Sequence, residues 1–213
     1  MNQSQSKIEV NKKEDEVNKT NMKIKDVDNQ EETNEIPNPI DVAITMLSFG
    51  FVPIALRNKV PLEKAWEQTK KEEALDIIIR NVESKRCNNI GILTGKPSGI
   101  VVIDVDARSE GLLKWFSLLE RNCVPDEGFV VLTGSSSYHY YFLYDEGTSQ
   151  LINTKLGNID IKTTSGQVVA PGSFNWEKKK LYAVCNGYPP GDNAKPILTK
   201  MPSWLLSFLL REK

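Results

Sequence analysis

Two carboxylates stand at the end of an apolar stretch in the middle of the chain. Residues 99–103 are Gly-Ile-Val-Val-Ile, and Asp104, Val105 and Asp106 follow them. Side chains alternate between the two faces of a strand, so Asp104 and Asp106 share one face. Carboxylates held side by side repel unless a proton or a cation lies between them, and Mg²⁺ and Mn²⁺ prefer oxygen ligands. The pair predicts half of a divalent-metal site, although an isolated Asp-x-Asp is more often a solvated strand end.

The single histidine of the chain lies in a second group of polar residues. Residues 133–137 are Thr-Gly-Ser-Ser-Ser, and a run of aromatic residues around the histidine follows them. In the strand expected there, Ser137, His139 and Tyr141 share one face. Hydroxyl and imidazole groups that converge on one place suit a phosphate. A lone histidine among aromatic residues is, however, often an ordinary sheet residue.

A third group lies further along the chain, where Asp160 and Lys162 alternate along one face of a predicted strand. Lys162 could simply neutralise Asp160, because exposed ion pairs arise freely and contribute only about 0–1 kcal/mol. The order of the groups favours a functional interpretation. A strand ending in Asp-x-Asp, a strand containing Ser-x-His and a strand with one aspartate follow one another.

One glycine-containing stretch is similar to a phosphate-binding P-loop but does not fit it. Residues 91–97 are Gly-Ile-Leu-Thr-Gly-Lys-Pro, so the two glycines are one residue too close. Pro97 stands where that motif needs Ser or Thr for Mg²⁺, and a strand is expected next instead of a helix. We expect a turn between two strands.

The elements that must position these groups follow from capping, periodicity and turn residues. We expect helices at residues 39–49 after the N-cap Asn38, after a capping box at 69–72, from a cap at Ser109 to residue 119, and at 204–210. Strands are expected at residues 51–56, 89–93, 100–105, 130–133, 138–144, 159–163, 167–170 and 180–184. This pattern predicts an α+β domain with a mixed or antiparallel sheet and flanking helices.

Composition limits the class of protein. The chain has 213 residues, of which 39% are hydrophobic and 26% charged, with a net charge of −1, which is typical of a folded, water-soluble protein. Apolar runs fall short of the ~20 residues that span a bilayer and no signal peptide is visible, so we expect no membrane partner and a cytoplasmic location. The three cysteines lie far apart, which predicts neither disulfides nor a zinc site.

The N-terminal segment differs in composition from the rest. Residues 1–35 contain no aromatic residue, glycine or proline and are rich in Asn, Gln, Lys and Glu. Such a segment cannot bury enough apolar surface to fold. We expect residues 1–36 to form a disordered polar tail and residues 37–213 to form one domain.

Together the three groups resemble the motifs of the bifunctional DNA primase/polymerases of plasmids, phages and other mobile elements, which belong to the archaeo-eukaryotic primase superfamily. That family has an acidic pair at a strand end, a Ser-x-His and one later acidic residue, here Asp104 and Asp106, Ser137 and His139, and Asp160. Flanking stretches are similar too, namely Lys59-x-Pro61 followed by Trp66, residues 89–95 and residues 168–173. The similarity covers residues 38–210.

The resemblance implies a fold, a reaction and partners. The fold would be an RRM-like sheet with helices behind it, joined to an N-terminal αβ unit. Asp104, Asp106 and Asp160 would hold two Mg²⁺ or Mn²⁺ ions for template-directed nucleotidyl transfer. Ser137, His139 and Lys162 would bind the phosphates of an incoming dNTP or NTP. A single-stranded DNA template and a replicative helicase are the implied partners.

Two other functions stay open at this stage. A non-catalytic module for single-stranded nucleic acid would stack bases on exposed aromatic residues such as Tyr138 and Tyr140. A metal-dependent nuclease or phosphodiesterase would use the same carboxylates to activate water. The three acidic positions argue against a pure binding module, and the Ser-x-His argues against a nuclease. The residues do not indicate whether dNTPs or NTPs are preferred, nor whether synthesis starts de novo or from a primer.

Overall fold

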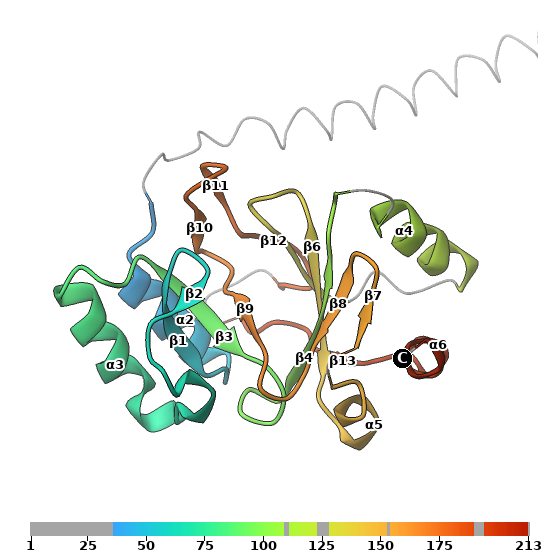
Figure 1. The fold of residues 1–213 in the computed structure, drawn as a ribbon, viewed down its shortest axis with the longest axis horizontal. Helices are drawn as coiled ribbons and strands as arrows, with labels where there is room; N and C mark the ends of the chain where they lie inside the picture. Colours follow the sequence, from blue (N-terminus) through green and yellow to red (C-terminus); the bar gives the residue numbers. More distant parts are fainter. Residues whose placement is uncertain (1–35, 109–110, 123–127, 153, 190–193, 213) are drawn as a thin grey trace, which may run out of the picture. The chain divides into compact units, whose positions relative to one another are not determined.

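The computed structural model describes residues 36–108, 111–122, 128–152, 154–189 and 194–212 (Figure 1). The described helices are α2 (Pro39–Ser48), α3 (Lys71–Glu83), α4 (Gly111–Arg121), α5 (Glu146–Ser149) and α6 (Ser203–Arg211), with a 3-10 turn η1 (Trp66–Gln68). The described strands are β1 (Pro53–Arg57), β2 (Val60–Pro61), β3 (Asn89–Leu93), β4 (Ile100–Val105), β5 (Phe129–Leu132), β6 (Tyr138–Leu143), β7 (Lys155–Leu156), β8 (Ile159–Lys162), β9 (Gln167–Val169), β10 (Phe174–Asn175), β11 (Lys180–Leu181), β12 (Ala183–Asn186) and β13 (Thr199–Lys200). The disorder expected for residues 1–36 concerns a segment that lies, except for Ile36, outside the described residues.

The N-terminal αβ unit is built on an antiparallel sheet with the strand order β2-β1-β3-β9. Helix α2 begins where the sequence predicts it, because the Asn38 side chain accepts a hydrogen bond from the Ile40 N–H at 3.0 Å and Pro39 fits the first turn. Helices α2 and α3 pack against this sheet and bury Met46 and Ile78 in its core. The last strand, β9, comes from much later in the chain.

The central sheet has the strand order β12-β5-β6-β4-β8-β7, with β13 parallel to β6. Strand β4 lies between β6 and β8 and is antiparallel to both. Its residues from Ile100 to Ile103 are fully buried. A strand that is covered on both faces needs a continuous apolar run, which explains the stretch that precedes the acidic pair.

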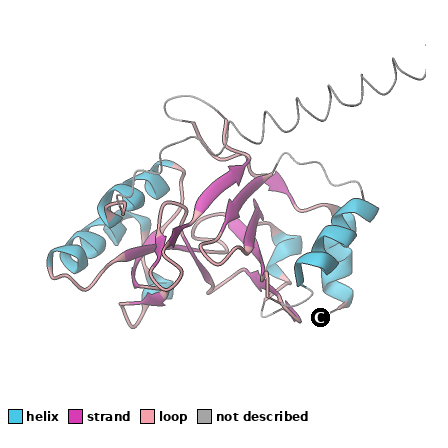
Figure 2. Cartoon of the chain, turned by 90° about the horizontal axis from the view of Figure 1, so that it is seen from above, coloured by secondary structure: helices cyan, strands magenta, loops and turns pink. Residues whose placement is uncertain are grey.

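The two faces of the central sheet carry separate cores. Val102 and Tyr141 project from one face and pack in the core shared with the N-terminal αβ unit. Ile103 projects from the other face, where it packs with the fully buried Trp115 of α4 and with α6. Figure 2 shows the helices on either side with the strands between them. Because side chains alternate along β4, Asp104 projects from the same face as Val102.

The start of α3 differs from the prediction. A capping box was expected at residues 69–72, but the N-cap is Lys70, whose N–H donates to the Glu73 carboxylate at 2.9 Å. Thr69 instead ends the turn η1, where its N–H donates to the Trp66 carbonyl at 3.1 Å. The box therefore forms one residue later than predicted. The cap expected at Ser109 lies outside the described residues.

Most of the expected strands differ from the structure by one or two residues at an end, and two differences are larger or change the pairing. The strand expected at residues 51–56 begins at Pro53. The strand expected at 180–184 is interrupted at the buried Tyr182, because β11 pairs with β10 in a small hairpin while β12 joins β5 at the edge of the central sheet. The turn expected in the stretch 91–97 is confirmed, since residues 94–99 join β3 to β4, and Gly95 and Ile100 bridge across the turn.

The fold class is the predicted one. The chain forms an α+β structure with flanking helices, and the parallel pairing of β13 with β6 makes the central sheet mixed. Among the described helices, none combines the length and the apolar character that crossing a membrane would require.

Candidate active site

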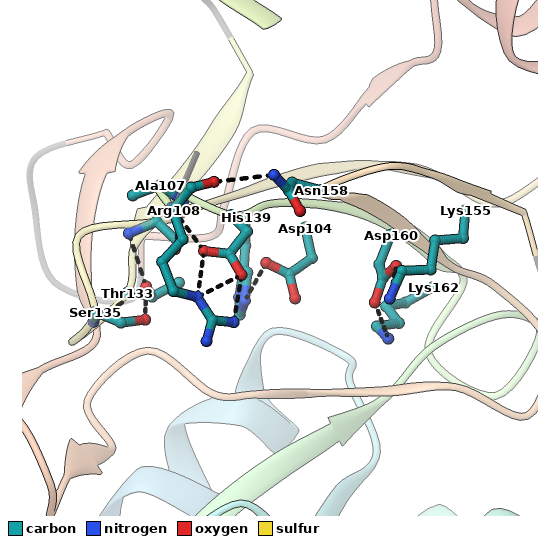
Figure 3. Close-up of polar contacts among 12 residues, drawn as sticks. Asp104, Ala107, Arg108, Thr133, Ser135, His139, Lys155, Asn158, Asp160 and Lys162 are labelled. Carbon is teal, nitrogen blue, oxygen red and sulfur yellow. Dashed lines mark hydrogen bonds and ion pairs between the residues drawn. The ribbon is translucent and has the colours of Figure 1, made fainter. Parts of the chain in front are cut away.

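Three strands of the central sheet bring an imidazole and two carboxylates into one row. The register pairs Asp104 of β4 with His139 of β6 on one side and with Asp160 of β8 on the other. Directly paired residues of antiparallel strands project from the same face, with Cβ atoms about 5 Å apart. The order across the sheet is His139, Asp104, Asp160 (Figure 3). The structure thus places the late aspartate on the face that carries the earlier pair.

His139 is a buried and neutral member of this row. Its side chain is 6% exposed, and its Nε2 lies 3.6 Å from the Oδ1 of Asp104. Burial lowers the pKa of His139, although the nearby Asp104 carboxylate acts in the opposite direction. A neutral imidazole carries one N–H and one acceptor nitrogen. Nδ1 has no hydrogen-bond partner among the described residues, so the packing around the ring, more than its hydrogen bonds, fixes its position.

Asp106 lies just past the end of β4, where Arg108 holds it. The Arg108 backbone N–H donates to the carboxylate at 2.9 Å, and its guanidinium donates through Nε and Nη2. This hydrogen-bonded guanidinium lowers the pKa of Asp106. The carboxylate is therefore charged at neutral pH. The Arg108 side chain is 87% exposed, so it is free to turn toward another anion.

Ser137 connects the turn before β6 to the end of β4. Its Oγ accepts a hydrogen bond from the Ala107 N–H at 2.9 Å. The turn closes on Thr133, whose Oγ1 accepts from the Ser137 N–H at 3.1 Å. Ser136, between them, has a φ of 62°, a left-handed conformation that is unusual for a residue other than glycine. The Ser-x-His turn and the Asp-x-Asp strand end are thus held together.

Gly134 allows the β10–β11 hairpin to pack on this turn. A Cβ atom at position 134 would lie 2.4 Å from the Asn175 Cβ and 2.7 Å from the Lys180 carbonyl oxygen. Only glycine permits such a close approach. After the hairpin, the chain places the Tyr182 ring 6.0 Å from the His139 ring, measured between centroids. The hairpin therefore helps to build the wall of the site.

A cavity of about 220 Å³, which we call the Asp104 pocket, opens beside this row. Lys59 reaches it from the turn between β1 and β2 of the N-terminal αβ unit. Other polar residues that line it are Asp104, Asp106, Arg108, Ser137, His139 and Lys162. Cations and hydroxyl groups here surround two carboxylates. A lining of this kind suits a phosphate group together with a divalent cation.

Asp160 faces two lysines instead of the Asp104 pocket. Its Oδ1 lies 3.3 Å from the Nζ of Lys155, and its Oδ2 lies 3.3 Å from the Nζ of Lys162 (Figure 3). It lines a second cavity, which we call the Asp160 pocket. Lys162 lines both cavities and so stands between them.

The comparison with protein families agrees with the motifs. The family model "Bifunctional DNA primase/polymerase, N-terminal", or Prim-Pol, matches residues 42–204. The chain belongs to the Prim-Pol family. The resemblance inferred from the three motifs is thereby confirmed, and the Prim-Pol domain is a nucleotidyltransferase of the primase/polymerase type.

Solved structures and curated proteins add little to this assignment. The polymerase domain of Mycobacterium tuberculosis Ligase D in complex with DNA is similar over 76% of this chain and 71% of that one, with 13% sequence identity and a TM-score of 0.35. No curated protein matches the chain.

The acidic residues of this Prim-Pol domain differ in how well they fit divalent ions. Asp104 is one-third exposed beside a neutral imidazole, and Asp106 lines the same cavity, so both offer the oxygen ligands that Mg²⁺ and Mn²⁺ prefer. Asp160 is turned toward its two lysines. Accordingly, no group of three His, Cys, Asp or Glu side chains is arranged around a metal position in the described part of the chain. Strand pairing sets Asp160 opposite Asp104, on the same face of the sheet.

The aromatic residues expected to stack on single strands lie elsewhere. Tyr138 and Tyr140 alternate with His139 and project from the opposite face of the Prim-Pol sheet. Tyr140 packs on Trp115 of α4 with ring centroids 5.0 Å apart, and Tyr138 packs on Phe116 at 6.0 Å. This packing leaves both rings half-buried, on the face opposite to the row of His139, Asp104 and Asp160. Neither tyrosine lines the Asp104 pocket.

Sequence reasoning did not assign several residues of the site, among them Lys59, which it named only as part of a flanking stretch. Arg108 could have been predicted from the sequence, since a cation two residues after Asp106 is close enough to pair with that carboxylate. Lys155 could have been predicted too, because the two-residue loop at Gly157 and Asn158 predicts a hairpin that sets Lys155 opposite Asp160. Tyr182 carried no signal, since only the packing of the Prim-Pol hairpin brings it beside the histidine.

Proposed function

We propose that this Prim-Pol domain adds nucleotides to a 3′-hydroxyl in template-directed order, as a primase, a DNA polymerase or both, in the replication of a mobile element. The observation that carries the proposal is the register of β4, which sets Asp104 between His139 and Asp160 on the face that opens into the Asp104 pocket. Single-stranded DNA would be the template, and a replicative helicase a partner in the cytoplasm.

The proposed reaction joins two nucleotides and releases pyrophosphate. The 3′-oxygen of one nucleotide forms a bond to the α-phosphorus of the other, while the bond from that phosphorus to the oxygen leading to the β-phosphate breaks. The hydroxyl proton passes to solvent. Two Mg²⁺ or Mn²⁺ ions held by Asp104, Asp106 and Asp160 would lower the pKa of the 3′-hydroxyl and neutralise the pyrophosphate.

Residues around the Asp104 pocket would bind and orient the triphosphate. Ser137 and His139 are both buried, so the hydroxyl and imidazole are held in place before a ligand arrives. Lys162, Arg108 and Lys59 line the same cavity and supply positive charge from three different segments of the chain. Charge-assisted hydrogen bonds from such groups to phosphate oxygens are about twice as strong as neutral ones.

A single assay separates this proposal from its rivals. The full chain is incubated with a labelled primer on a single-stranded template, with Mg²⁺ or Mn²⁺ and with dNTPs or NTPs in turn, and the products are resolved by length. A parallel reaction omits the primer. We expect longer strands, and none with Asp106→Asn. Shortened strands would indicate a nuclease, and binding without any change in length would indicate a binding module. Either result would overturn the proposal.

A further inference from the structure

The Asp160 pocket has the chemistry of an anion site. It is a cavity of about 300 Å³ beside the Asp104 pocket. Lys155 and Lys162 both line it and share the single carboxylate of Asp160. One positive charge is therefore in excess. The hydroxyl-bearing residues Thr164 and Ser165 lie along the same wall.

A buried threonine adds a second, independent indication of a ligand. Thr154 also lines the pocket and is 3% exposed, yet its Oγ1 has no hydrogen-bond partner among the described residues. Buried hydroxyl groups are nearly always hydrogen-bonded, because an unsatisfied one costs about 1–3 kcal/mol. An oxygen of a ligand in this cavity would supply the missing partner.

The position of the pocket says which ligand would bind there. Across the sheet the order is His139, Asp104, Asp160 and then Lys155, so the two cavities flank the row of carboxylates from opposite sides. In phosphoryl transfer the attacking oxygen and the leaving oxygen lie roughly in line, on opposite sides of the phosphorus. If the triphosphate lies on the His139 side, the attacking 3′-hydroxyl must come from the Asp160 side.

We propose that the Asp160 pocket binds the phosphate of the nucleotide that supplies the attacking 3′-hydroxyl. This inference rests on the proposed function, since it assigns the second substrate of the same reaction. The phosphate could belong to the primer, as the last internucleotide linkage, or to a free initiating nucleotide, as its 5′-triphosphate. Lys155 lines this pocket but not the Asp104 pocket, so it is the cation that remains for a second phosphate when Lys162 binds the triphosphate and Asp160 binds a metal ion. Its one positive charge matches the single negative charge of a primer linkage. The primer terminus is therefore the assigned ligand.

The test measures binding, so it does not need an active enzyme. Fluorescence anisotropy reports the affinity of the full chain for a primer–template without nucleotide, using either an ordinary primer or one with a neutral methylphosphonate at its last linkage. We expect the methylphosphonate to weaken binding to the wild type about tenfold. Lys155→Ala, whose side chain is 67% exposed in the wild type, should weaken binding of the ordinary primer by a similar factor and be insensitive to the methylphosphonate. Lys96→Ala, which changes an exposed lysine outside both cavities, should behave like the wild type.

Two further measurements make the outcome decisive. Thr154→Val keeps the shape of the side chain but removes the hydroxyl, and it should raise the KM for primer severalfold while leaving the KM for dNTP unchanged. Lys155→Ala is also compared with the wild type in reactions with and without primer. If the variant lost more activity without primer than with it, the ligand would be the initiating nucleotide, and the choice of the primer would be overturned. If the methylphosphonate weakened binding to Lys155→Ala as much as it weakens binding to the wild type, the lysine and the linkage would act independently. That result would overturn the assignment of the pocket. A wild type that binds primer as expected but never extends it would refute the proposed function and leave the pocket standing.

Discussion

Replacing Asp104 by asparagine should make the protein more stable and inactive at once. Asp104 and Asp160 are paired across β4 and β8, so they project from the same face of the sheet although the Asp160 carboxylate is turned toward its two lysines. Two unit charges at the roughly 5 Å spacing of directly paired residues repel by roughly 3 kcal/mol at an effective dielectric constant of about 20, and this is an upper limit because Asp160 is turned toward its lysines. Each side chain is about one-third exposed, and two lysines flank Asp160, so screening reduces this repulsion to about 1 kcal/mol. Asp104→Asn removes the repulsion but keeps the shape.

Urea unfolding with and without divalent cations tests this reasoning. In EDTA the free energy of unfolding of Asp104→Asn should exceed that of the wild type by about 1 kcal/mol. With Mg²⁺ at about 100 times its Kd the wild type should gain about 2.7 kcal/mol, and the variant should gain much less. Primer extension should be lost only in the variant. Asp76→Asn, a change on the exposed face of α3, is the matched control and should alter neither property. A destabilised variant in EDTA, or one that still extends primers, would refute the argument.

Three further predictions concern the walls of the site. Ser136→Gly should raise the free energy of unfolding by about 1 kcal/mol, since it relieves a left-handed conformation, whereas Ser135→Gly should lower it; urea unfolding of both variants checks the sign. Gly134→Ala should cost about 1–3 kcal/mol in the same assay, because its Cβ would meet Asn175, and an unchanged midpoint would contradict the close packing of the hairpin. Burial raises the pKa of Tyr182 to about 12, above the ~10 of an unfolded tyrosine, so its contribution to stability is complete below about pH 10 and declines as the pH rises toward 12. Between about pH 10 and pH 12 the free energy of unfolding of the wild type should therefore fall by up to about 2 kcal/mol more than that of Tyr182→Phe. Equal decreases in the two proteins, measured by urea unfolding, would contradict the raised pKa of Tyr182.

Local features of the fold were predictable because they depend on neighbours in sequence. Asn38 and Pro39 mark the start of α2 through a cap and a fixed φ, and the structure shows both. The period of two along a strand sufficed to place Asp104 and Asp106 on one face. At Thr69 the same kind of reasoning was wrong by one residue, because the turn η1 already used its N–H. Capping rules do not report such competition between adjacent turns.

Features that depend on distant parts of the chain were not predictable from residue patterns. Asp160 could be set beside Asp104 only through the family resemblance, since the register between β4 and β8 is a long-range property. That Asp160 would turn toward Lys155 depends on side-chain torsions and local charge. The packing of Tyr138 and Tyr140 against α4 has a similar origin, because both faces of β6 are apolar enough to be buried. Which face α4 covers is decided by tertiary packing.

The route of the chain through its two sheets has a consequence for how the protein assembles. Strand β9 completes the N-terminal sheet by pairing with β3, although β8, only a few residues before it, belongs to the central sheet. A nascent chain that has not yet been extended to residue 167 lacks β9, so the apolar edge of β3 has no strand to pair with. We therefore expect the first half to stay unfolded on the ribosome until the second half emerges, and the two layers to melt in a single cooperative transition.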